Sequence, residues 1–444
     1  ACEVYGVMTL TQPIQIIGAG IGGLTLARCF KNRGIQSIIF EKNPSPAHHN
    51  YGISLQPWTT KLLTNVLGID ESTFARRVAV DGSRGGMGQV YPSHVSGLGS
   101  GKGGPKLLRA HRGRLEGLLR EQLDVQWGHV LEGIEASGTG HTLTFKDREK
   151  VECGLVIDSS GVHSPIRKSL VPDVQLNVLP YVVFRGTRRI DRTAFKAIYE
   201  SRSKDGNVLE TKQGDTLLQI SINDYVQDSE AVDISYIYSR PSHSNSEDPL
   251  HRPDRALNQA SDISEAFFAE VSKLRDLEQP FKDAFDEENV RKGRTLHWLM
   301  RDVLVEKDEL VRLASQGKGV YFIGDAAHAL PILGGEGACF AIRDAAELAG
   351  CVEDARGKDG KVVVDAEMFY GRIFGDWEEG IISLGEVVKD AVLKTSALQI
   401  PHDHEIQVLF TAIHEIKGML NEARIALNTD FRAEFSHHHG ISSI

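Results

Sequence analysis

Residues 14–23 read Ile14-Gln15-Ile16-Ile17-Gly18-Ala19-Gly20-Ile21-Gly22-Gly23. The apolar residues before the first glycine predict a short buried strand of the kind found in parallel sheets. Residues 24–30 then carry apolar side chains at helical spacing, and Gly34 follows where a left-handed helix cap is expected. A second apolar run, at residues 37–40, predicts another strand. A strand, a glycine turn, a helix and a parallel strand form a βαβ unit, which indicates the α/β class.

The glycines of this turn match the spacing of a dinucleotide-binding fingerprint. Gly18 permits the tight turn, Gly20 lets the backbone approach a pyrophosphate, and Gly23 lets the helix pack closely on the strand. Free N–H groups at the start of the helix attract the anion. Glu41 ends the second strand, where a carboxylate accepts hydrogen bonds from an adenosine ribose. The pattern fits NAD and FAD equally well.

A second pattern lies further along the chain, after the apolar run at residues 320–323. It reads Gly324-Asp325-Ala326-Ala327-His328 and continues through Pro331 to Gly334-Gly335-Glu336-Gly337. A helix is expected from about 337 to 350, and its N-terminus would carry about half a positive charge. Glycines at such a place let the backbone lie directly against a flat ligand, because no side chain holds it away.

This second pattern resembles the flavin-binding GD motif of the FAD-dependent aromatic hydroxylases, the group A flavoprotein monooxygenases. The resemblance implies that Asp325 hydrogen-bonds the ribityl chain of FAD and that residues 334–337 lie against the flavin ring. The helix N-terminus would then stabilise the anionic reduced flavin that reacts with oxygen. Ile332 stands where the family usually has proline, and Glu336 stands where glutamine is common. These departures predict a reshaped flavin face.

Residues 155–167 resemble the DG motif of the same family, a turn that serves both FAD and the nicotinamide nucleotide. The residues that match are Gly161, Ser164 and Arg167. Ser160 replaces the aspartate of the motif, and Asp158 lies two places earlier. This replacement leaves open how the nicotinamide nucleotide is held.

Two shorter matches extend the resemblance, so that it covers about residues 14 to 390. Residues 52–57 resemble the segment that follows the ribose carboxylate in the family. Arg112 resembles the arginine that begins a helix of the family and contacts FAD through its guanidinium group. The residues predicted to bind the cofactor are therefore Gly18, Gly20, Gly22, Gly23, Glu41, Lys42, Arg112, Asp325, Ala326, Pro331, Gly334, Gly335, Gly337 and Ala338. No metal site is predicted.

The fold predicted from these patterns is a Rossmann-like FAD-binding domain with an inserted β-sheet substrate domain and a C-terminal helical segment. Nine glycines between residues 82 and 104 predict a segment that is mobile or held by a ligand. The predicted boundaries are 9–80 for the first FAD-binding part, 81–104 for the glycine-rich segment, 105–175 for the second FAD-binding part, 176–285 for the substrate domain, 286–395 for the third FAD-binding part and 396–444 for the helical tail.

Three residues of the substrate domain are candidates for contact with the substrate. Arg185 lies on a predicted strand that borders the substrate in the resembling family, and its charge can hold a phenolate or enolate. Tyr236 and Tyr238 lie on another predicted strand and point to the same side, because side chains alternate with a period of two. Their rings can stack on a substrate or donate a hydrogen bond to it, although tyrosines on strands are also common core residues.

The resemblance also implies a reaction. NAD(P)H reduces FAD, oxygen adds at flavin C4a, and the hydroperoxide passes one oxygen atom to an electron-rich carbon by hydroxylation or epoxidation. NADPH is expected to bind transiently, with NADH as the other option, because no second GxGxxG pattern follows a predicted strand and opens a helix. Baeyer–Villiger insertion and, from another class, a non-catalytic FAD-binding protein remain open. The family resemblance alone favours a substrate from secondary metabolism.

Composition narrows the partners. A net charge of −10 argues against nucleic acid, which needs a basic surface, and no apolar run is long enough to span a membrane. Five scattered cysteines without metal-type spacing fit reduced thiols in the cytoplasm. The expected partners are a small-molecule substrate and O2. The composition leaves monomer and homodimer equally open.

Overall fold

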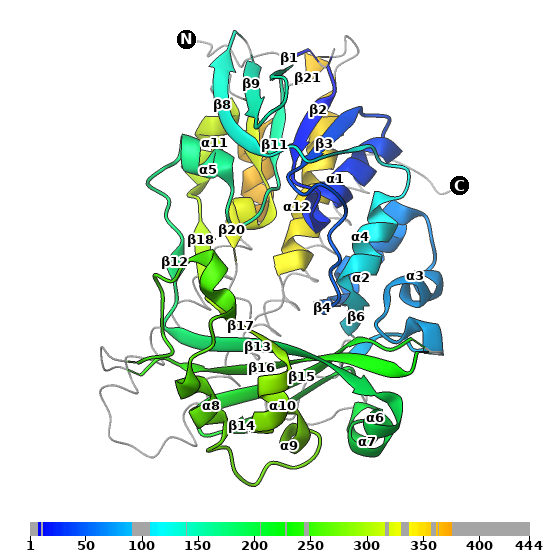
Figure 1. Ribbon diagram of the computed structural model, residues 1–444. Helices are drawn as coiled ribbons and strands as arrows, with labels where there is room; N and C mark the ends of the chain where they lie inside the picture. The colour runs from blue at the N-terminus through cyan, green and yellow to red at the C-terminus, as the bar shows by residue number, and fades with distance from the viewer. Residues whose placement is uncertain are drawn as a thin grey trace.

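The computed structural model describes residues 8–9, 12–90, 107–138, 140–204, 206–226, 229–243, 248–315, 319–329, 337–356, 361–362 and 364–374. Its described part forms two domains. The upper one in Figure 1 is built on a parallel sheet flanked by helices, and the lower one is built on a broad antiparallel sheet. Among the predicted cofactor residues, Pro331, Gly334 and Gly335 lie outside the described residues, as do residues 91–104 of the glycine-rich segment and the tail from 396.

The parallel sheet confirms the predicted Rossmann-like arrangement. Its strand order is β19-β11-β2-β3-β7, and every neighbouring pair is parallel. The strands are β2 (Ile14–Ile17), β3 (Ser37–Glu41), β7 (Val125–Trp127), β11 (Val156–Asp158) and β19 (Val320–Phe322). Helices α1 (Ile21–Asn32) and α12 (Gly337–Asp354) pack together beside it. The first glycine pattern and the second therefore meet in one domain.

Smaller sheets and helices complete this domain. The strands are β1 (Met8–Thr9), β4 (Gly52–Leu55), β5 (Gln89–Val90), β6 (Leu107–His111), β8 (Leu131–Ser137), β9 (Gly140–Phe145), β10 (Val151–Cys153), β12 (Asn177–Val178), β18 (Arg301–Leu304), β20 (His328–Ala329) and β21 (Lys361–Val362). The helices are α2 (Pro57–Leu67), α3 (Glu71–Val78), η1 (Gly82–Arg84), α4 (Arg112–Arg120), α5 (Pro165–Leu170), α11 (Lys307–Ser315) and η4 (Gly324–Ala326). In the described part of the chain, no helix is long and apolar enough to cross a membrane.

The antiparallel sheet lies below the parallel domain in the view of Figure 1. Its order is β14-β15-β16-β13-β17. The strands are β13 (Tyr181–Asp191), β14 (Val208–Gln213), β15 (Thr216–Asp224), β16 (Ala231–Pro241) and β17 (Arg294–Trp298). The sheet thus continues past residue 285, where the substrate domain was expected to end, because β17 pairs with β13.

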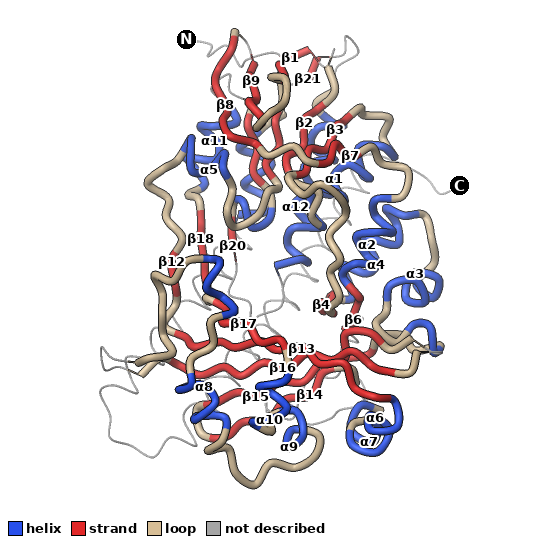
Figure 2. The backbone as a smooth tube through the Cα atoms, viewed as in Figure 1, coloured by secondary structure: helices blue, strands red, loops and turns tan. Residues whose placement is uncertain are grey.

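Helices cover the lower face of this sheet and leave the other face toward the parallel domain (Figure 2). They are α6 (Arg192–Ile198), α7 (Glu200–Ser203), α8 (Glu265–Val271), α9 (Phe281–Ala284) and α10 (Glu287–Lys292), whereas η3 (Leu257–Ser261) lies beside the edge strand β17. The register of β13 with its two neighbouring strands shows which side chains lie on each face of the sheet. Arg185 is paired with Ile237 and Leu296, whereas its neighbour Gly186 is paired with Tyr236. Paired residues share a face, so Arg185 and Tyr236 point to opposite sides.

Gly186 leaves room for a tyrosine ring under the sheet. A Cβ at this position would lie 1.9 Å from Cζ of Tyr236. We expect Gly186→Ala to lower the free energy of unfolding by about 1–3 kcal/mol, the usual cost of overpacking. Urea unfolding followed by circular dichroism measures it. Gly133→Ala is the matched control, since a Cβ there meets nothing within 4 Å; equal stability of the two variants would contradict the packing argument.

Candidate active site

The first glycine turn has the geometry that its three roles require. Gly18 has φ of 105° in the left-handed region, where a side chain is strained. A Cβ on Gly23 would lie 2.1 Å from the carbonyl oxygen of Gly18, so the helix packs against the turn only because Gly23 has no side chain. A Cβ on Gly20 would meet nothing within 4 Å. The backbone at Gly20 therefore borders open space that a ligand can fill.

The start of α1 has the geometry of an anion-binding helix N-terminus. Gly20 is the N-cap residue, and no side chain caps the helix, so the first N–H groups remain available. Glu41 lies beside them at the end of β3, where its Oε2 accepts a hydrogen bond from Ala19 N at 2.9 Å and its Oε1 accepts one from Asn43 N at 3.0 Å. A carboxylate has about four lone-pair sites, so Glu41 keeps acceptor capacity for ribose hydroxyls.

Small residues bring the second pattern against the first. Gly324 has φ of 58°, and a Cβ there would lie 2.9 Å from Cβ of Ala341 on α12. Gly22 packs on the same alanine, with 3.4 Å between its would-be Cβ and Cβ of Ala341. Buried Asp344 fixes the turn from below, because its Oδ2 accepts hydrogen bonds from Gly324 N at 2.8 Å and lies 2.7 Å from Nε2 of His328. The N-termini of α1 and α12 thus converge.

Asp325 lies at this point of convergence. It is exposed while its neighbours in the turn are buried, and its Oδ1 lies 3.5 Å from where a Cβ on Gly337 would stand. Solvent therefore reaches the carboxylate although protein atoms surround it. Burial raises the pKa of Asp325, and the nearby charges of His328, Arg112 and Arg167 act in the opposite direction. The carboxylate faces the start of α12 and is free to accept hydrogen bonds from a ligand.

The DG-like turn has its aspartate in an unusual place, and the structure explains why. Asp158 is fully buried at the end of β11, and its carboxylate accepts hydrogen bonds from Ser160 N at 2.9 Å and from the hydroxyl of Ser164. Burial raises the pKa of Asp158, and these hydrogen bonds oppose the shift. Arg167 then donates to the carbonyl oxygen of Ala326 at 2.7 Å. Asp158 thus shapes this turn, and Arg167 connects it to the turn that carries Asp325.

Arg112 begins α4 and is held by two partners. Its Nε donates to Oε1 of Glu116 at 2.8 Å, and its Nη1 donates to the hydroxyl of Tyr51. The other predicted cofactor residues are less constrained. Lys42 is exposed beside Glu41, and Ala338 is half-buried in the first turn of α12.

Arg185 is held between two aromatic rings from different segments. Its guanidinium carbon lies 4.6 Å from the ring centroid of Tyr51 and 5.2 Å from that of Trp298. Tyr51 precedes β4 in the parallel domain, and Trp298 ends β17, so the arginine lies where the two domains meet. Arg185 forms no hydrogen bond or ion pair with any residue that the structure describes. Its charge is positioned but not neutralised.

Tyr236 and Tyr238 lie on the opposite face from Arg185. Tyr236 is fully buried, its hydroxyl is 2.8 Å from Oγ1 of Thr295, and its ring packs edge-on against Phe285. Tyr238 is 2% exposed and donates to Oε2 of Glu270 on α8 at 2.6 Å. Both hydroxyls already have partners in the helix-covered core, so the structure does not bring these tyrosines together with Arg185.

This placement predicts a structural effect of removing the tyrosine hydroxyls. We expect Tyr238→Phe to lower the free energy of unfolding by about 1.5–3 kcal/mol, because its hydrogen bond goes to a carboxylate, and Tyr236→Phe by about 0.5–1.5 kcal/mol. Substrate KM should stay within about twofold for both variants, since neither hydroxyl contacts the Arg185 face. Chemical unfolding and steady-state kinetics measure the two quantities. A large rise in KM with unchanged stability would contradict the placement.

The sequence alone did not predict the aromatic partners of Arg185 or the hydrogen bond from Arg167 to the turn that carries Asp325. Tyr51 and Trp298 are far from Arg185 in the chain, and an isolated tyrosine or tryptophan gives no pattern. A signal existed for Arg167, since it lies within the DG-like motif, but its carbonyl acceptors became visible only in three dimensions.

The described residues fit the cofactor that the patterns imply. The open backbone at Gly20, the uncapped start of α1 and the exposed carboxylate of Asp325 lie along one edge of the parallel sheet, as a dinucleotide with a diphosphate and a hydroxylated chain requires.

Fold and site together define a dinucleotide-binding flavoprotein. The FAD binding domain family matches residues 11–178. The FAD-dependent monooxygenase adaC of Aspergillus niger is 32% identical over 386 residues, which cover 84% of this chain and 91% of that protein. The chain therefore belongs to the family of FAD-dependent monooxygenases.

Solved structures share the fold. 2,6-Dihydroxypyridine-3-hydroxylase from Arthrobacter nicotinovorans has a TM-score of 0.64 at 18% identity, over 86% of this chain and 93% of that one. HpxO of Klebsiella pneumoniae, solved with FAD, has a TM-score of 0.61 at 19% identity, over 92% of this chain and 97% of that one. The protein is an FAD-dependent enzyme, so the alternative of a non-catalytic FAD-binding protein is set aside.

Proposed function

We propose that this enzyme transfers one oxygen atom from O2 to an electron-rich carbon of a small organic substrate that carries an acidic hydroxyl or enol, with NADPH as the reductant. Bound FAD supplies the chemistry, since reduced flavin activates O2 for transfer to carbon. The site of action proposed is the cytoplasm, because Cys29, Cys153, Cys339 and Cys351 are free thiols. Hydroxylation is the form of the reaction that the family favours.

In this proposal, each part of the cofactor has protein groups to hold it. The N–H groups from Gly20 to Gly22 bind the diphosphate, and Glu41 accepts hydrogen bonds from the adenosine ribose. Asp325 accepts hydrogen bonds from the ribityl chain. The first turn of α12 at Gly337 directs its positive end toward the flavin, which favours negative charge there. Arg112 adds a fixed positive charge on the same side.

One observation carries the proposal, the charge of Arg185 without a partner among the described residues. A guanidinium held between Tyr51 and Trp298 loses little freedom when it binds a ligand, so its hydrogen bonds cost less entropy. Next to this charge, the anionic form of a phenol or enol is favoured and its pKa is lowered. Electron density of the oxygen is then delocalised into the ring or double bond, which makes the ortho or para carbon of a phenolate, or the α-carbon of an enolate, a better nucleophile toward the transferred oxygen.

The surroundings of Arg185 also limit access of water. Val183 and Met300 are buried on the same face, and Ile237 and Trp298 pack against them. An apolar wall of this kind strengthens the charge interaction and keeps water out of the site, which would limit unproductive release of hydrogen peroxide when FAD is bound.

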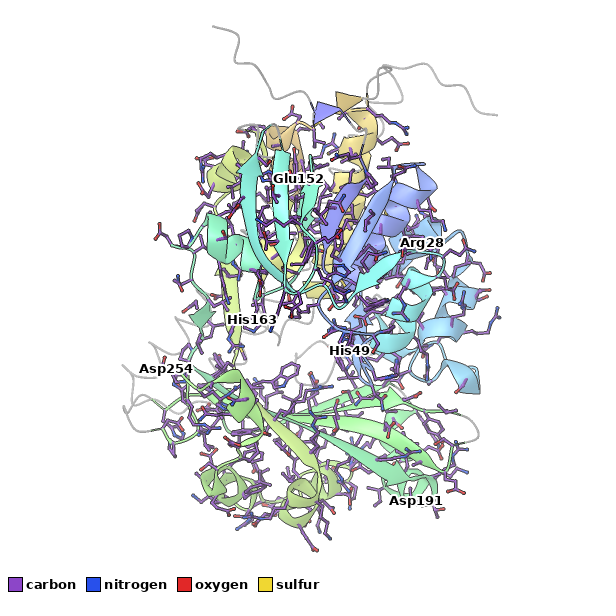
Figure 3. The ribbon with its side chains drawn as sticks, turned by 45° about the horizontal axis from the view of Figure 1, so that its top comes forward. Arg28, His49, Glu152, His163, Asp191 and Asp254 are labelled. Atoms are coloured by element: carbon purple, nitrogen blue, oxygen red, sulfur yellow. The ribbon has the colours of Figure 1, made fainter. Side chains whose placement is uncertain are left out.

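NADPH has a basic region available beside the DG-like turn. Burial, followed by the charges of Arg301, Lys168 and Lys42, holds the pKa of His163 below its usual range. These groups come from separate segments of the parallel domain, and His163 lies at the lower edge of that domain (Figure 3). A cluster of positive charges suits the phosphates of a nicotinamide dinucleotide, and transient binding fits its partial exposure.

Removal of one of these charges should affect NADPH alone. We expect Arg301→Gln to raise the KM for NADPH about two- to fivefold, the effect of losing a partly exposed interaction of up to about 1 kcal/mol. Its kcat at saturating NADPH and its FAD content should not change. Arg189→Gln, an equal charge change at an exposed position of β13, is the control. The basic region would be ruled out as the docking site if both variants had the same KM as the wild type.

Labelled oxygen tests the proposed reaction. Purified holoenzyme is incubated with NADPH, isotopically labelled O2 and a panel of phenols, enols and neutral aromatic compounds. We expect one labelled atom in the products of acidic substrates, at a carbon ortho or para to a phenol oxygen or at the α-carbon of an enol. Fragment masses also separate hydroxylation from epoxidation and from Baeyer–Villiger insertion. Turnover of neutral compounds in preference to acidic ones would refute the role given to the site.

A further inference from the structure

A second arginine reaches the face of the sheet that carries Arg185. Arg109 lies on β6 and is paired with Ser54 of β4. Its Nη1 donates to Oγ of Ser54 at 3.1 Å, and its Nη2 donates to Oγ of Ser221 on β15 at 3.2 Å. In Figure 1, β4 and β6 stand directly above the antiparallel sheet. Arg109 therefore extends from the parallel domain down to the sheet.

The charge of Arg109 is poorly compensated. Both of its hydrogen-bond acceptors are neutral hydroxyls, its Nε is buried without a partner, and it forms no ion pair with any described residue. Glu210 is the carboxylate that acts on it, and Glu210 already accepts a hydrogen bond from Gln219 at 2.6 Å. Burial, and then the positive charge of Arg185, lower the pKa of Arg109 to about 10. Two cations are thus held close enough to repel each other.

The chain is shaped to keep Arg109 in this place. A Cβ on Gly52 would lie 2.5 Å from Nε of Arg109, so the arginine crosses β4 where there is no side chain. Ser221 is buried and lies 2.9 Å from Ser235 across the two strands. Arg109 could serve only to join the two domains through these hydroxyls, but neutral acceptors need no buried cation. Holding a charge against another charge is costly unless an anion joins them.

The register sets the separation of the two arginines. Ser221, which binds Arg109, lies on β15, and Arg185 lies on β13. β16 lies between them, and Ser221 is level with Ser235 and Thr187, two residues from Arg185 along β13. Two strand spacings and two residues of rise place the backbones of Ser221 and Arg185 about 12 Å apart. Arginine side chains are long, and the two guanidinium groups lie on the same face of the sheet, so they can approach each other more closely than the backbones do. An anion with oxygens several ångströms apart can therefore contact both guanidinium groups, whereas a single hydroxyl contacts one.

We propose that Arg109 is a second specificity-determining residue of the substrate site and that, with Arg185, it selects substrates whose negative charge is shared by two oxygens, such as the enolate of a 1,3-dicarbonyl or the anion of a hydroxyquinone. This inference rests on the proposed function, because it uses the Arg185 face as the substrate site. It assigns Arg185 to one oxygen and Arg109 to the other. Neutral and single-oxygen ligands keep only part of this binding.

Three probes of similar size test the inference by the change in flavin absorbance of the holoenzyme. Lawsone is an acidic hydroxynaphthoquinone whose charge is shared by two oxygens, its methyl ether is neutral, and β-naphthol has one weakly acidic hydroxyl. We expect the wild type to bind lawsone at least about tenfold more tightly than the ether. Arg109→Gln should weaken lawsone binding about tenfold and change the other two affinities less than about twofold. Arg185→Gln should weaken both lawsone and β-naphthol.

The outcomes separate the two proposals. If Arg109→Gln weakens all three probes equally or none of them, the role of Arg109 is refuted, while a loss in Arg185→Gln still supports the proposed function. If Arg185→Gln changes nothing, the proposed substrate site itself fails. Should Arg109→Gln not fold with FAD, Arg109→Lys keeps the charge and must keep the preference for lawsone. Gly52→Ala, which keeps Arg109 but displaces it, must reduce that preference.

Discussion

The Asp325→Ala variant is expected to be purified with most of its FAD lost. The carboxylate is exposed at the start of α12, next to Gly337, where it can accept hydrogen bonds from ribityl hydroxyls. A hydrogen bond to a charged group contributes about 1.5–3 kcal/mol, so the affinity for FAD should fall about 10- to 100-fold. Asp325→Asn keeps the shape of the side chain but loses its charge, so its affinity for FAD should lie between those of the wild type and Asp325→Ala. The ratio of flavin to protein absorbance after gel filtration measures the loss.

Asp354→Ala is the control for this variant, because it removes an exposed aspartate from the other end of the same helix. It should retain the FAD content of the wild type. Thermal unfolding in excess FAD distinguishes weak binding from misfolding, since saturating ligand restores stability when only the affinity has fallen. Full FAD occupancy and normal turnover in Asp325→Ala would remove Asp325 from the cofactor site.

Replacing Arg185 by glutamine is expected to separate NADPH consumption from product formation. FAD should stay bound, because Arg185 lies on β13 and not on the elements that form the nucleotide site. Loss of a charge-assisted hydrogen bond to the substrate anion should lower kcat/KM about 10- to 100-fold. Oxygen would then leave largely as hydrogen peroxide, since a poorly placed carbon cannot compete for it. Product per NADPH and peroxide release measure this uncoupling.

Two further variants show whether charge or shape matters at this position. Arg185→Lys keeps the charge but loses the planar fork and part of the ring contacts, so it should recover some of the product yield. Arg189→Gln removes an exposed charge from the same strand and should behave as the wild type. A normal yield of product per NADPH in Arg185→Gln would exclude this arginine from the substrate site.

The cofactor half of the site could be predicted well from sequence because its signals are local. Gly18, Gly20 and Gly23 lie within one turn, and their roles depend on backbone conformation and on contacts within the βαβ unit. The GD-like turn is equally compact, and Asp325 is the exposed residue in it. Motifs of this kind are set by the local chain, so a single sequence reveals them.

The substrate half depends on contacts between distant segments and could not be predicted in the same way. A period of two indicates that Tyr236 and Tyr238 share a face but not which face, and both faces of this sheet are covered in part. The sandwich around Arg185 joins Tyr51 and Trp298, which only the register of β13 with β17 and the contact between domains bring together. The same holds for Arg109.

The central claim is that FAD binds at the glycine turns and that Arg185 binds the acidic oxygen of the substrate. A crystal structure of the holoenzyme with an acidic compound that it accepts as a substrate tests this claim most directly. We expect the diphosphate of FAD at the N–H groups of Gly20 to Gly22, the ribityl chain on Asp325, and the acidic oxygen of the substrate within hydrogen-bonding distance of Arg185. The reacting carbon should face the flavin. A substrate bound beneath the sheet among the helices, or one that leaves Arg185 without contact, would contradict the account.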